Sequence, residues 1–146
     1  MLFKTLQMVN FRQYKGETKI AFSCDEDKNV TIILGDNTFG KTTLLQAFNW
    51  CLYGEALLEN PDMLLNYDVA SKLHENASTD VEVEVTLIHS GIEYILTRTQ
   101  KHQKKSGKVI GLNPSVKVSY KQKDGQTESI KDTKIETVIN TILPKD

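Results

Sequence analysis

The stretch that decides the fold, residues 30–43, reads VTIILGDNTFGKTT. Five β-branched or aliphatic residues lead into Gly35, and a second glycine, Gly40, is followed by Lys41 and Thr42. This spacing fits the pattern G-x-x-x-x-G-K-[S/T] at every fixed position. Glycines let the backbone turn its N–H groups toward phosphate oxygens, the lysine reaches the β- and γ-phosphates, and the hydroxyl ligates Mg²⁺. The stretch therefore predicts a phosphate-binding loop.

The chain on either side of this loop favours the same interpretation. Residues 30–34 are apolar on both faces, which is typical of a central strand covered on two sides. From Thr42 onward, apolar residues recur at helical spacing, and Gly54 stands where a helix would end. These apolar residues are Leu44, Leu45, Phe48, Cys51 and Leu52. We therefore prefer a phosphate loop to a chance match in an ordinary strand, turn and helix.

The rest of the chain is rich in strand patterns and ends in a helix. Alternating apolar and polar residues predict strands over 2–9, 18–22, 80–89, 92–98 and 115–122. Ser90 and Gly91 form the turn of a hairpin between the third and fourth of these strands. Residues 55–79 predict short helical turns and loops, and residues 101–108 predict a basic loop. An apolar stripe predicts a helix over 133–143.

The composition is that of a single globular domain. The 146 residues are 39% hydrophobic and 25% charged, with a formal net charge of -1, so no overall basic excess points to nucleic acid. The two cysteines have neither metal-ligand spacing nor the density of a disulfide scaffold. No apolar run approaches the roughly 18 residues needed to cross a bilayer, and no signal segment is evident at Met1. We expect a soluble cytoplasmic protein with no membrane contact.

Several segments together carry a family resemblance. They are VNFRQYKGETKIAF (9–22), GDNTFGKTT (35–43), LLQAFNWCLYGE (44–55) and GIEYILTRTQ (91–100). This combination resembles the N-terminal ATPase lobe of the SMC/RecF/SbcC-type ATPases of chromosome maintenance and DNA repair. The final INTILPKD (139–146) is most similar to the DndD branch, which is linked to DNA phosphorothioation and related defence systems.

The resemblance implies an α/β fold, the ABC/SMC-like N-terminal lobe of a P-loop NTPase. In that lobe a mixed sheet has an antiparallel β-hairpin layer packed beside the strand and helix that flank the phosphate loop. Strands from a C-terminal lobe normally complete the central sheet. We therefore expect this chain to have an exposed apolar edge that a partner or a second copy covers.

The resemblance also implies roles for individual residues, with ATP and Mg²⁺ as ligands. Arg12 would approach the nucleotide, and the segment DMLLNY (62–67) would lie near its base or ribose. The expected phosphate and magnesium contacts are Gly35, Asn37, Thr38, Gly40, Lys41, Thr42 and Thr43. Lys41 would be the catalytic residue and Thr42 the magnesium ligand. Thr38 stands where the family usually has glycine, and Asp36 is expected to face solvent.

Other parts of an ATP site in this family lie outside the patterns found in residues 1–146. The acidic strand, the signature motif and the histidine switch come from a C-terminal lobe, usually beyond a long coiled coil. We therefore interpret the chain as the N-terminal lobe of an SMC-like ATPase head, a fragment of a longer protein. It would hydrolyse ATP to ADP and phosphate only when the C-terminal lobe completes it and two heads engage, as a homodimer in the whole protein.

Weaker signals concern charge. The basic residues in and after the predicted loop are Lys101, His102, Lys104, Lys105, Lys108, Lys117, Lys121 and Lys123. They form either a phosphate-contacting patch for DNA, without sequence specificity, or a solvated hairpin tip whose lysines protect a sheet edge. The histidines at 74, 89 and 102 are scattered and are expected at the surface. Asp80, Glu82 and Glu84 alternate with valines and predict a solvated strand face.

Three alternatives stay open at this point. The first is a nucleotide-binding subunit of a transporter-type ABC ATPase, which Asn37 and the NFRQYKGE opening (10–17) disfavour. The second is a non-hydrolytic interaction module that keeps a nucleotide as a structural ligand. A self-contained kinase or GTPase is the least attractive, because no second-site carboxylate and no Asn-Lys-x-Asp sequence is found.

Overall fold

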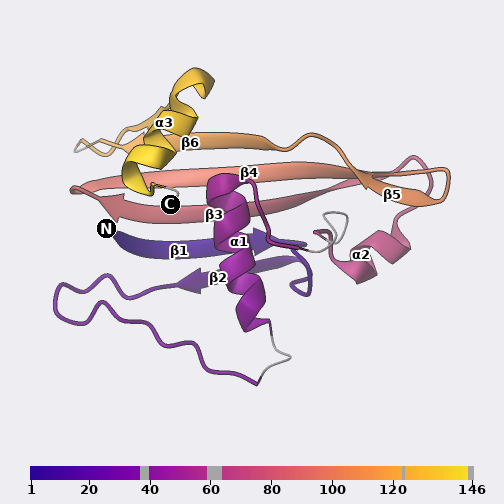
Figure 1. Ribbon diagram of the computed structural model, residues 1–146, viewed down its shortest axis with the longest axis horizontal. Coiled ribbons are helices and arrows are strands. Elements are labelled where there is room, and N and C mark those ends of the chain that lie inside the picture. Colours follow the sequence, from indigo (N-terminus) through magenta and orange to yellow (C-terminus); the bar gives the residue numbers. More distant parts are fainter. Residues whose placement is uncertain (37–39, 59–63, 123, 145–146) are drawn as a thin grey trace.

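The computed structural model describes residues 1–36, 40–58, 64–122 and 124–144, and its centre is a seven-stranded sheet. The strand order is β2-β1-β3-β4-β6-β7, with β5 paired to the far end of β4 (Figure 1). Every pairing between these strands is antiparallel. The strands are β1 Leu2–Val9, β2 Glu17–Ala21, β3 Ser78–His89, β4 Ile92–Lys105, β5 Lys108–Gly111, β6 Ser115–Lys121 and β7 Thr127–Ser129.

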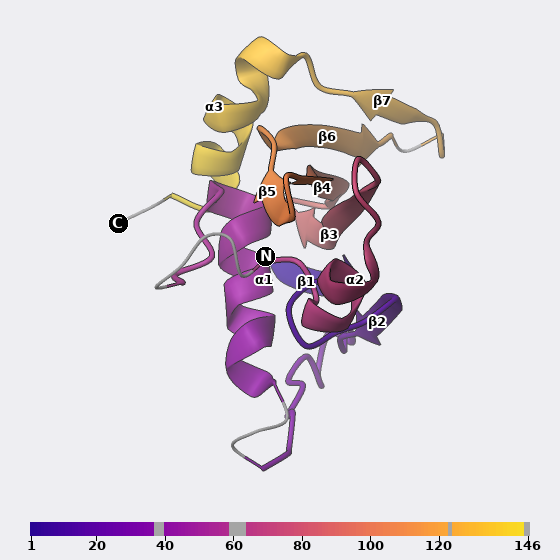
Figure 2. The same cartoon turned by 90° about the vertical axis from the view of Figure 1, so that its right-hand side faces the viewer.

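Two helices cover one face of this sheet. Helix α1 (Lys41–Tyr53) crosses the strands in front of the sheet, and α3 (Asp132–Ile142) lies on the same side above it (Figures 1 and 2). The short helix α2 (Tyr67–Lys72) lies toward the end of the sheet that carries β5. The α/β class and the antiparallel hairpin layer are confirmed, as are the helices predicted after the phosphate loop and at 133–143. None of the described helices is long and apolar enough to cross a membrane.

Period-two alternation in β3 explains which face is covered. Val81, Val83 and Val85 are fully buried beneath α1, whose Cys51 thiol donates to the carbonyl oxygen of Val83 at 3.3 Å. On the opposite face, the carboxylate of Glu84 accepts a hydrogen bond from the Thr97 hydroxyl, and Glu82 accepts one from Thr99. The predicted solvated strand face is confirmed for Asp80, which is exposed, whereas Glu82 and Glu84 on the same face are half-buried.

The predicted strand at residues 30–34 is wrong. The segment has no regular secondary structure, and Val30, Ile32 and Leu34 are strongly exposed, Leu34 by 89%. A strand forms only beside a partner that takes up its N–H and C=O groups, and β1 is the single strand that pairs with β2 among the described residues. The apolar pattern marks a surface to be covered, but no described part of this chain covers it.

The predicted basic loop at 101–108 is also wrong, because it belongs to regular strands. Strand β4 continues to Lys105 and turns at Ser106–Gly107 into β5, both turn residues having positive φ. The prediction that His102 lies at the surface fails for the same reason: alternation turns this side chain inward, and it is 1% exposed. His74 is exposed as expected, and His89 is half-buried.

Candidate functional site

The candidate site is the N-terminus of α1. Gly40 is the N-cap residue, with φ 86° and ψ 15°, and no side chain caps the helix. The first turn holds Lys41 and no acidic residue. The first backbone N–H groups of a helix have no intrahelical partner, and the helix dipole adds partial positive charge there. This end of α1 is therefore electrostatically suited to an anion.

The residues predicted to contact phosphate differ in exposure and in hydrogen bonding at this helix start. The Lys41 ammonium donates a hydrogen bond to the carbonyl of Gly35. Thr42 is exposed at the helix start, whereas Thr43 is buried and donates from Oγ1 to the Oε1 atom of Gln13 at 2.6 Å. Asp36 is exposed, as expected. The predicted ligands at 37 and 38 lie outside the described residues.

The connection between β1 and β2 supports this helix start with three consecutive side chains. Arg12 donates from Nη1 to Gln46, Gln13 accepts from Thr43, and the Tyr14 hydroxyl reaches the carbonyl of Gly40 at 3.4 Å. The partners stand at positions 40, 43 and 46, three residues apart, so they share one face of the first two turns of α1. Arg12 is thereby brought to the first two turns of α1, although it lies 34 residues from Gln46 in sequence.

Tyr14 also explains why position 40 suits glycine. A Cβ atom on Gly40 would approach the Tyr14 hydroxyl to 3.1 Å, and the left-handed φ would strain any other side chain. Burial raises the pKa of Tyr14, and its hydroxyl donates a hydrogen bond to the Gly40 carbonyl.

A second element holds this connection through contacts that the sequence did not reveal. Residues 64–66 bind it through the backbone: Arg12 N to Leu64 O at 2.8 Å, Asn66 N to Asn10 O at 2.8 Å, and the bridge of Phe11 with Leu65. Figure 2 shows the start of α2, which follows this segment, beside the β1–β2 connection. Nothing local in the sequence signals the pairing, because its partners are 52 to 56 residues apart.

A pocket of about 540 Å³ opens between the β1–β2 connection and α2. Its lining includes Arg12, Gln13, Asn66 and Tyr67, and Tyr67 is 83% exposed. Tyr67 belongs to the DMLLNY segment, of which only residues 64–67 are described, so the sequence pointed to this region but not to its geometry. Across the described residues, no group of three or more His, Cys, Asp or Glu side chains could hold a metal ion.

The opposite end of α1 is fixed by a cation. Arg98 donates from Nε to the carbonyl of Cys51 at 3.1 Å, where the helix dipole is negative. A Cβ atom on Gly54, whose φ is 77°, would lie 3.2 Å from the Arg98 guanidinium. Burial lowers the pKa of Arg98 and raises that of the Cys51 thiol to about 12. This end of the helix is a packed and capped structural feature.

The sheet, the helix behind the glycine-rich loop and the lysine at its start define a P-loop ATPase domain, and the comparison with known families agrees. The chain belongs to the AAA domain family, which it matches over residues 5–146. The resemblance to the SMC/RecF-type P-loop ATPases is thereby confirmed, whereas the DndD branch stays a prediction.

The chain is similar to several proteins named DNA replication and repair protein RecF. The Clostridium kluyveri protein is 41% identical over 69 residues, which is 47% of this chain and 18% of that protein. The Thermosynechococcus vestitus protein is 30% identical over 113 residues, 77% of this chain and 26% of the relative. The Chlorobium phaeobacteroides protein is 28% identical over 124 residues, 82% of this chain and 33% of the relative. The chain thus spans a third or less of these relatives.

Proposed function

We propose that this chain is the ATP-binding lobe of a DNA-associated RecF/SMC-type ATPase. The observation that carries the proposal is the start of α1, where a left-handed glycine, a lysine and a first turn without acids meet below Arg12. An MgATP phosphate chain would replace the Gly35 carbonyl as the partner of Lys41. The released ammonium would then meet a fully charged acceptor, which is the stronger hydrogen bond.

The remaining contacts divide between the phosphates, the metal and the base. Thr42 is the described side chain suited to Mg²⁺, because its hydroxyl is exposed on the first turn of α1. The ion would arrive with the nucleotide, whose phosphate oxygens supply further ligands, as is usual for Mg²⁺. Bound there, it would neutralise phosphate charge during transfer. We place the base or ribose in the pocket beside Tyr67, because Arg12, which is expected to approach the nucleotide, lines the same pocket.

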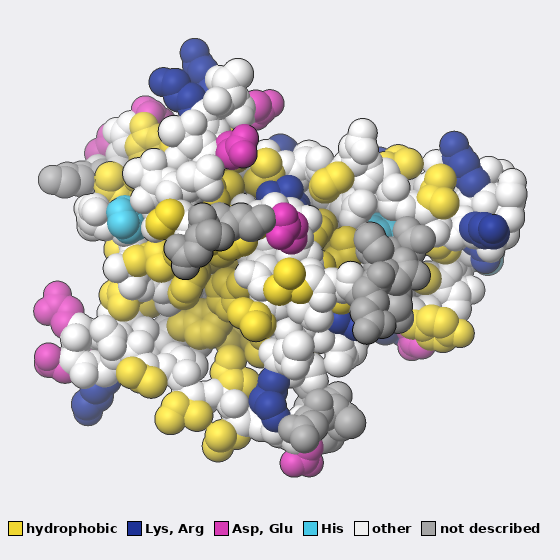
Figure 3. Space-filling model, viewed as in Figure 1, with side chains coloured by type: hydrophobic (Ala, Val, Ile, Leu, Met, Phe, Trp, Pro, Cys, Tyr) yellow, Lys and Arg dark blue, Asp and Glu magenta, His cyan; other side chains and the backbone are white. Residues whose placement is uncertain are grey.

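The exposed segment at 30–34 supports the proposal that the rest of a longer polypeptide completes this lobe. Ile32 and Leu34 on that segment and Leu45 on α1 are all strongly exposed, and Figure 3 shows hydrophobic side chains gathered on this side of α1. Since the chain spans 18–33% of the relatives above, we assign this surface to a C-terminal lobe that adds strands there. Hydrolysis to ADP and phosphate would await that lobe and the engagement of two heads as a homodimer.

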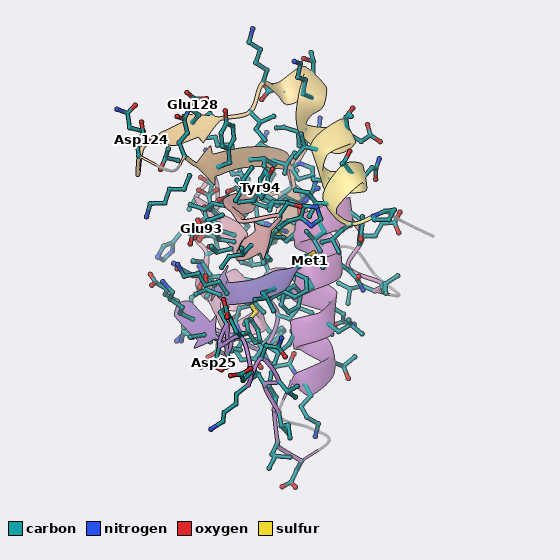
Figure 4. All side chains as sticks on the ribbon, turned by 90° about the vertical axis from the view of Figure 1, so that its left-hand side faces the viewer. Met1, Asp25, Glu93, Tyr94, Asp124 and Glu128 are labelled. Carbon is teal, nitrogen blue, oxygen red and sulfur yellow. The ribbon has the colours of Figure 1, made fainter. Side chains whose placement is uncertain are left out.

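DNA contact is proposed for the hairpin of β4 and β5. Lys101, Lys105 and Lys108 are exposed on it, and Figure 3 shows dark blue side chains at this end of the molecule. Glu93 and Glu128 lie at the opposite end of the molecule, the end seen in Figure 4, where Glu93 forms an ion pair with Lys4. The exposed lysines of the hairpin would contact a phosphate backbone without reading bases, although Glu75 accepts hydrogen bonds from the N–H groups of Ser106 and Gly107 at the hairpin turn.

The experiment that tests the nucleotide site is calorimetric titration of MgATP into this chain and into Lys41→Ala. Loss of a charge-assisted hydrogen bond predicts affinity weakened by about 10- to 100-fold. Lys134→Ala, an exposed lysine on α3, is the matched control and should bind like the unmodified chain. Equal binding by Lys41→Ala and the unmodified chain would contradict the proposal.

The DNA proposal has its own test. Replacing Lys105 and Lys108 by Gln should weaken binding to any DNA duplex. It should also reduce the slope of log affinity against log salt by roughly one to two, about one for each phosphate that is no longer neutralised. Fluorescence anisotropy with two unrelated duplex sequences measures both quantities. An unchanged salt slope would remove this hairpin from the DNA surface and leave its lysines as protection of the sheet edge.

A further inference from the structure

We propose that Asn66 is a positioning residue that fixes Arg12 for nucleotide binding and joins it to α2. The pocket beside α2 and the phosphate loop would then respond to a nucleotide as one unit. This inference rests on the proposed function, because it assigns to Asn66 a task in the same site.

The backbone of Arg12 is held from both sides by the segment that contains Asn66. The Arg12 N–H donates to the carbonyl of Leu64 at 2.8 Å. The Arg12 carbonyl accepts a hydrogen bond from the side-chain amide of Asn66, Nδ2, at 2.6 Å. Both polar groups of the peptide backbone at this residue are therefore satisfied by residues 64–66, and Asn66 is only 6% exposed.

This hold is needed because the backbone of Arg12 is strained. Its φ is 50°, and Asn10 two residues earlier has φ 53°. Asn tolerates the left-handed region through local hydrogen bonding, whereas arginine does so rarely. Such a conformation persists only when its surroundings over-determine it, and it is common at binding sites. Without the Asn66 amide, the Arg12 carbonyl would lose its hydrogen-bond partner, and the backbone position from which the Arg12 side chain extends would no longer be fixed.

The same asparagine begins α2. Its Oδ1 atom accepts a hydrogen bond from the backbone N–H of Val69 at 3.3 Å, so one side chain caps α2 with its oxygen and holds Arg12 with its nitrogen. Tyr67 follows directly and lines the same pocket as Arg12. Arg12 in turn contacts Gln46 on α1. A continuous chain of contacts thus runs from the pocket, through Asn66 and Arg12, to the helix that carries Lys41.

The test separates the two halves of the Asn66 side chain. Asn66→Ser keeps an oxygen that caps helices well but has no amide to reach Arg12. Asn66→Asp keeps the size and the capping oxygen and replaces the donor by an acceptor. We expect MgATP affinity to fall roughly tenfold in each variant, because a buried carbonyl loses its partner. Asn66→Ser adds no charge and Asn66→Asp changes no volume, so the missing amide donor is the one change that the two variants share.

A double-mutant cycle distinguishes positioning from general destabilisation. In an Arg12→Ala background, Asn66→Ser should change MgATP affinity by less than about twofold, since the group it positions is gone. Equal losses in both backgrounds would mean that Asn66 only stabilises the fold, and no loss in either would mean that it is irrelevant to binding; each result overturns the inference. Ser71→Ala, which removes a hydroxyl bond within α2 and does not touch Arg12, is the matched control.

A second readout does not need the nucleotide. The Nε–Hε resonance of Arg12 in the free protein should move in Asn66→Ser and stay in place in Ser71→Ala. An unmoved resonance in Asn66→Ser would overturn the inference even if binding weakened. If the unmodified chain fails to bind MgATP, the proposed function fails and takes this inference with it. If the unmodified chain binds and the Asn66 variants bind equally well, only this inference fails.

Discussion

Two segments flank the candidate site and differ in how the chain holds them. Residues 10–16 are fixed by backbone bonds to residues 64–66, by side-chain bonds to α1 and by the buried Phe11 ring, which lies 5.8 Å from that of Trp50. Residues 30–36 are exposed throughout. From the preceding loop, the Ser23 N–H donates a hydrogen bond to the Thr31 hydroxyl. Contacts within the described residues hold residues 10–16 in place, whereas residues 30–36 present apolar side chains to solvent.

The comparison shows that a site can be half-organised. The positions of Arg12, Gln13 and Tyr14 follow from contacts within the described residues, so this side should behave as a rigid wall. On the other side of the loop, residues 30–34 have the apolar, β-branched composition of a strand, but no described strand pairs with them. We therefore expect substitutions on the two sides to have very different effects on stability, although both sides carry apolar side chains.

The largest effect is expected for Phe11→Ala on the organised side. The Phe11 side chain is fully buried, and truncation would leave a cavity between the β1–β2 connection and α1. Such changes cost about 3–5 kcal/mol of unfolding free energy. Urea denaturation followed by circular dichroism measures the loss. A change below about 1 kcal/mol would mean that this connection is not a packed wall.

An intermediate effect concerns pH and the buried face of α1. The pKa of the Cys51 thiol is about 12 in the folded protein against 9.0 as its ordinary value, because burial disfavours the thiolate. Above about pH 9 the unfolded chain releases this proton and the folded protein keeps it, so the folded state binds more protons. Stability should then fall as pH rises from about 9 toward 12, and its contribution is fully present below that range.

Cys51→Ala provides the comparison for this pH dependence. Urea midpoints at pH 7.5 and 10 should fall more in the unmodified chain than in the variant, since the variant lacks the titrating group. Parallel falls in both proteins would assign the pH dependence to other groups.

The smallest effect is expected for Ile32→Ser on the unpartnered side. Ile32 is 76% exposed, so its replacement should change the unfolding free energy by no more than about 0.5 kcal/mol. The same substitution should reduce self-association at high concentration, because it removes part of an exposed apolar surface. Urea denaturation and analytical ultracentrifugation measure the two quantities. A large loss of stability would show that residues 30–36 are packed in solution and would erase the contrast between the two sides.

These differences explain how far the sequence could predict the structure. Local patterns were sufficient for β1, for the hairpin of β3 and β4 and for α1, because periodicity and turn residues act within a few positions. The prediction of a strand at 30–34 was wrong because an apolar run shows which surface must be covered but not which element covers it. The prediction of a loop at the end of β4 was wrong because lysines suggest a loop. Alternation continues there and turns His102 inward.

For the site, the motif located Lys41 and Thr42, and the family resemblance added Arg12. The sequence could not predict the role of residues 64–66, because their pairing with the β1–β2 connection joins distant segments. It also did not predict that Thr43 turns its hydroxyl toward Gln13. Both features depend on tertiary contacts, and neither leaves a local pattern. Gln13 was therefore missed as a member of the site, and Asn66 was predicted only as part of the DMLLNY segment, without its contact to Arg12.

Hydrogen exchange with and without MgATP tests the central claim most directly. In the free protein, the amides of Arg12 and Asn66 should exchange slowly because each donates to a backbone carbonyl, whereas those of residues 30–36 should exchange rapidly. MgATP should slow exchange at Gly40 to Thr43 in the unmodified chain and leave it unchanged in Lys41→Ala. Slowing confined to the opposite end of α1, near Cys51 and Gly54, or slowing that persists in Lys41→Ala, would contradict a phosphate site at this helix start.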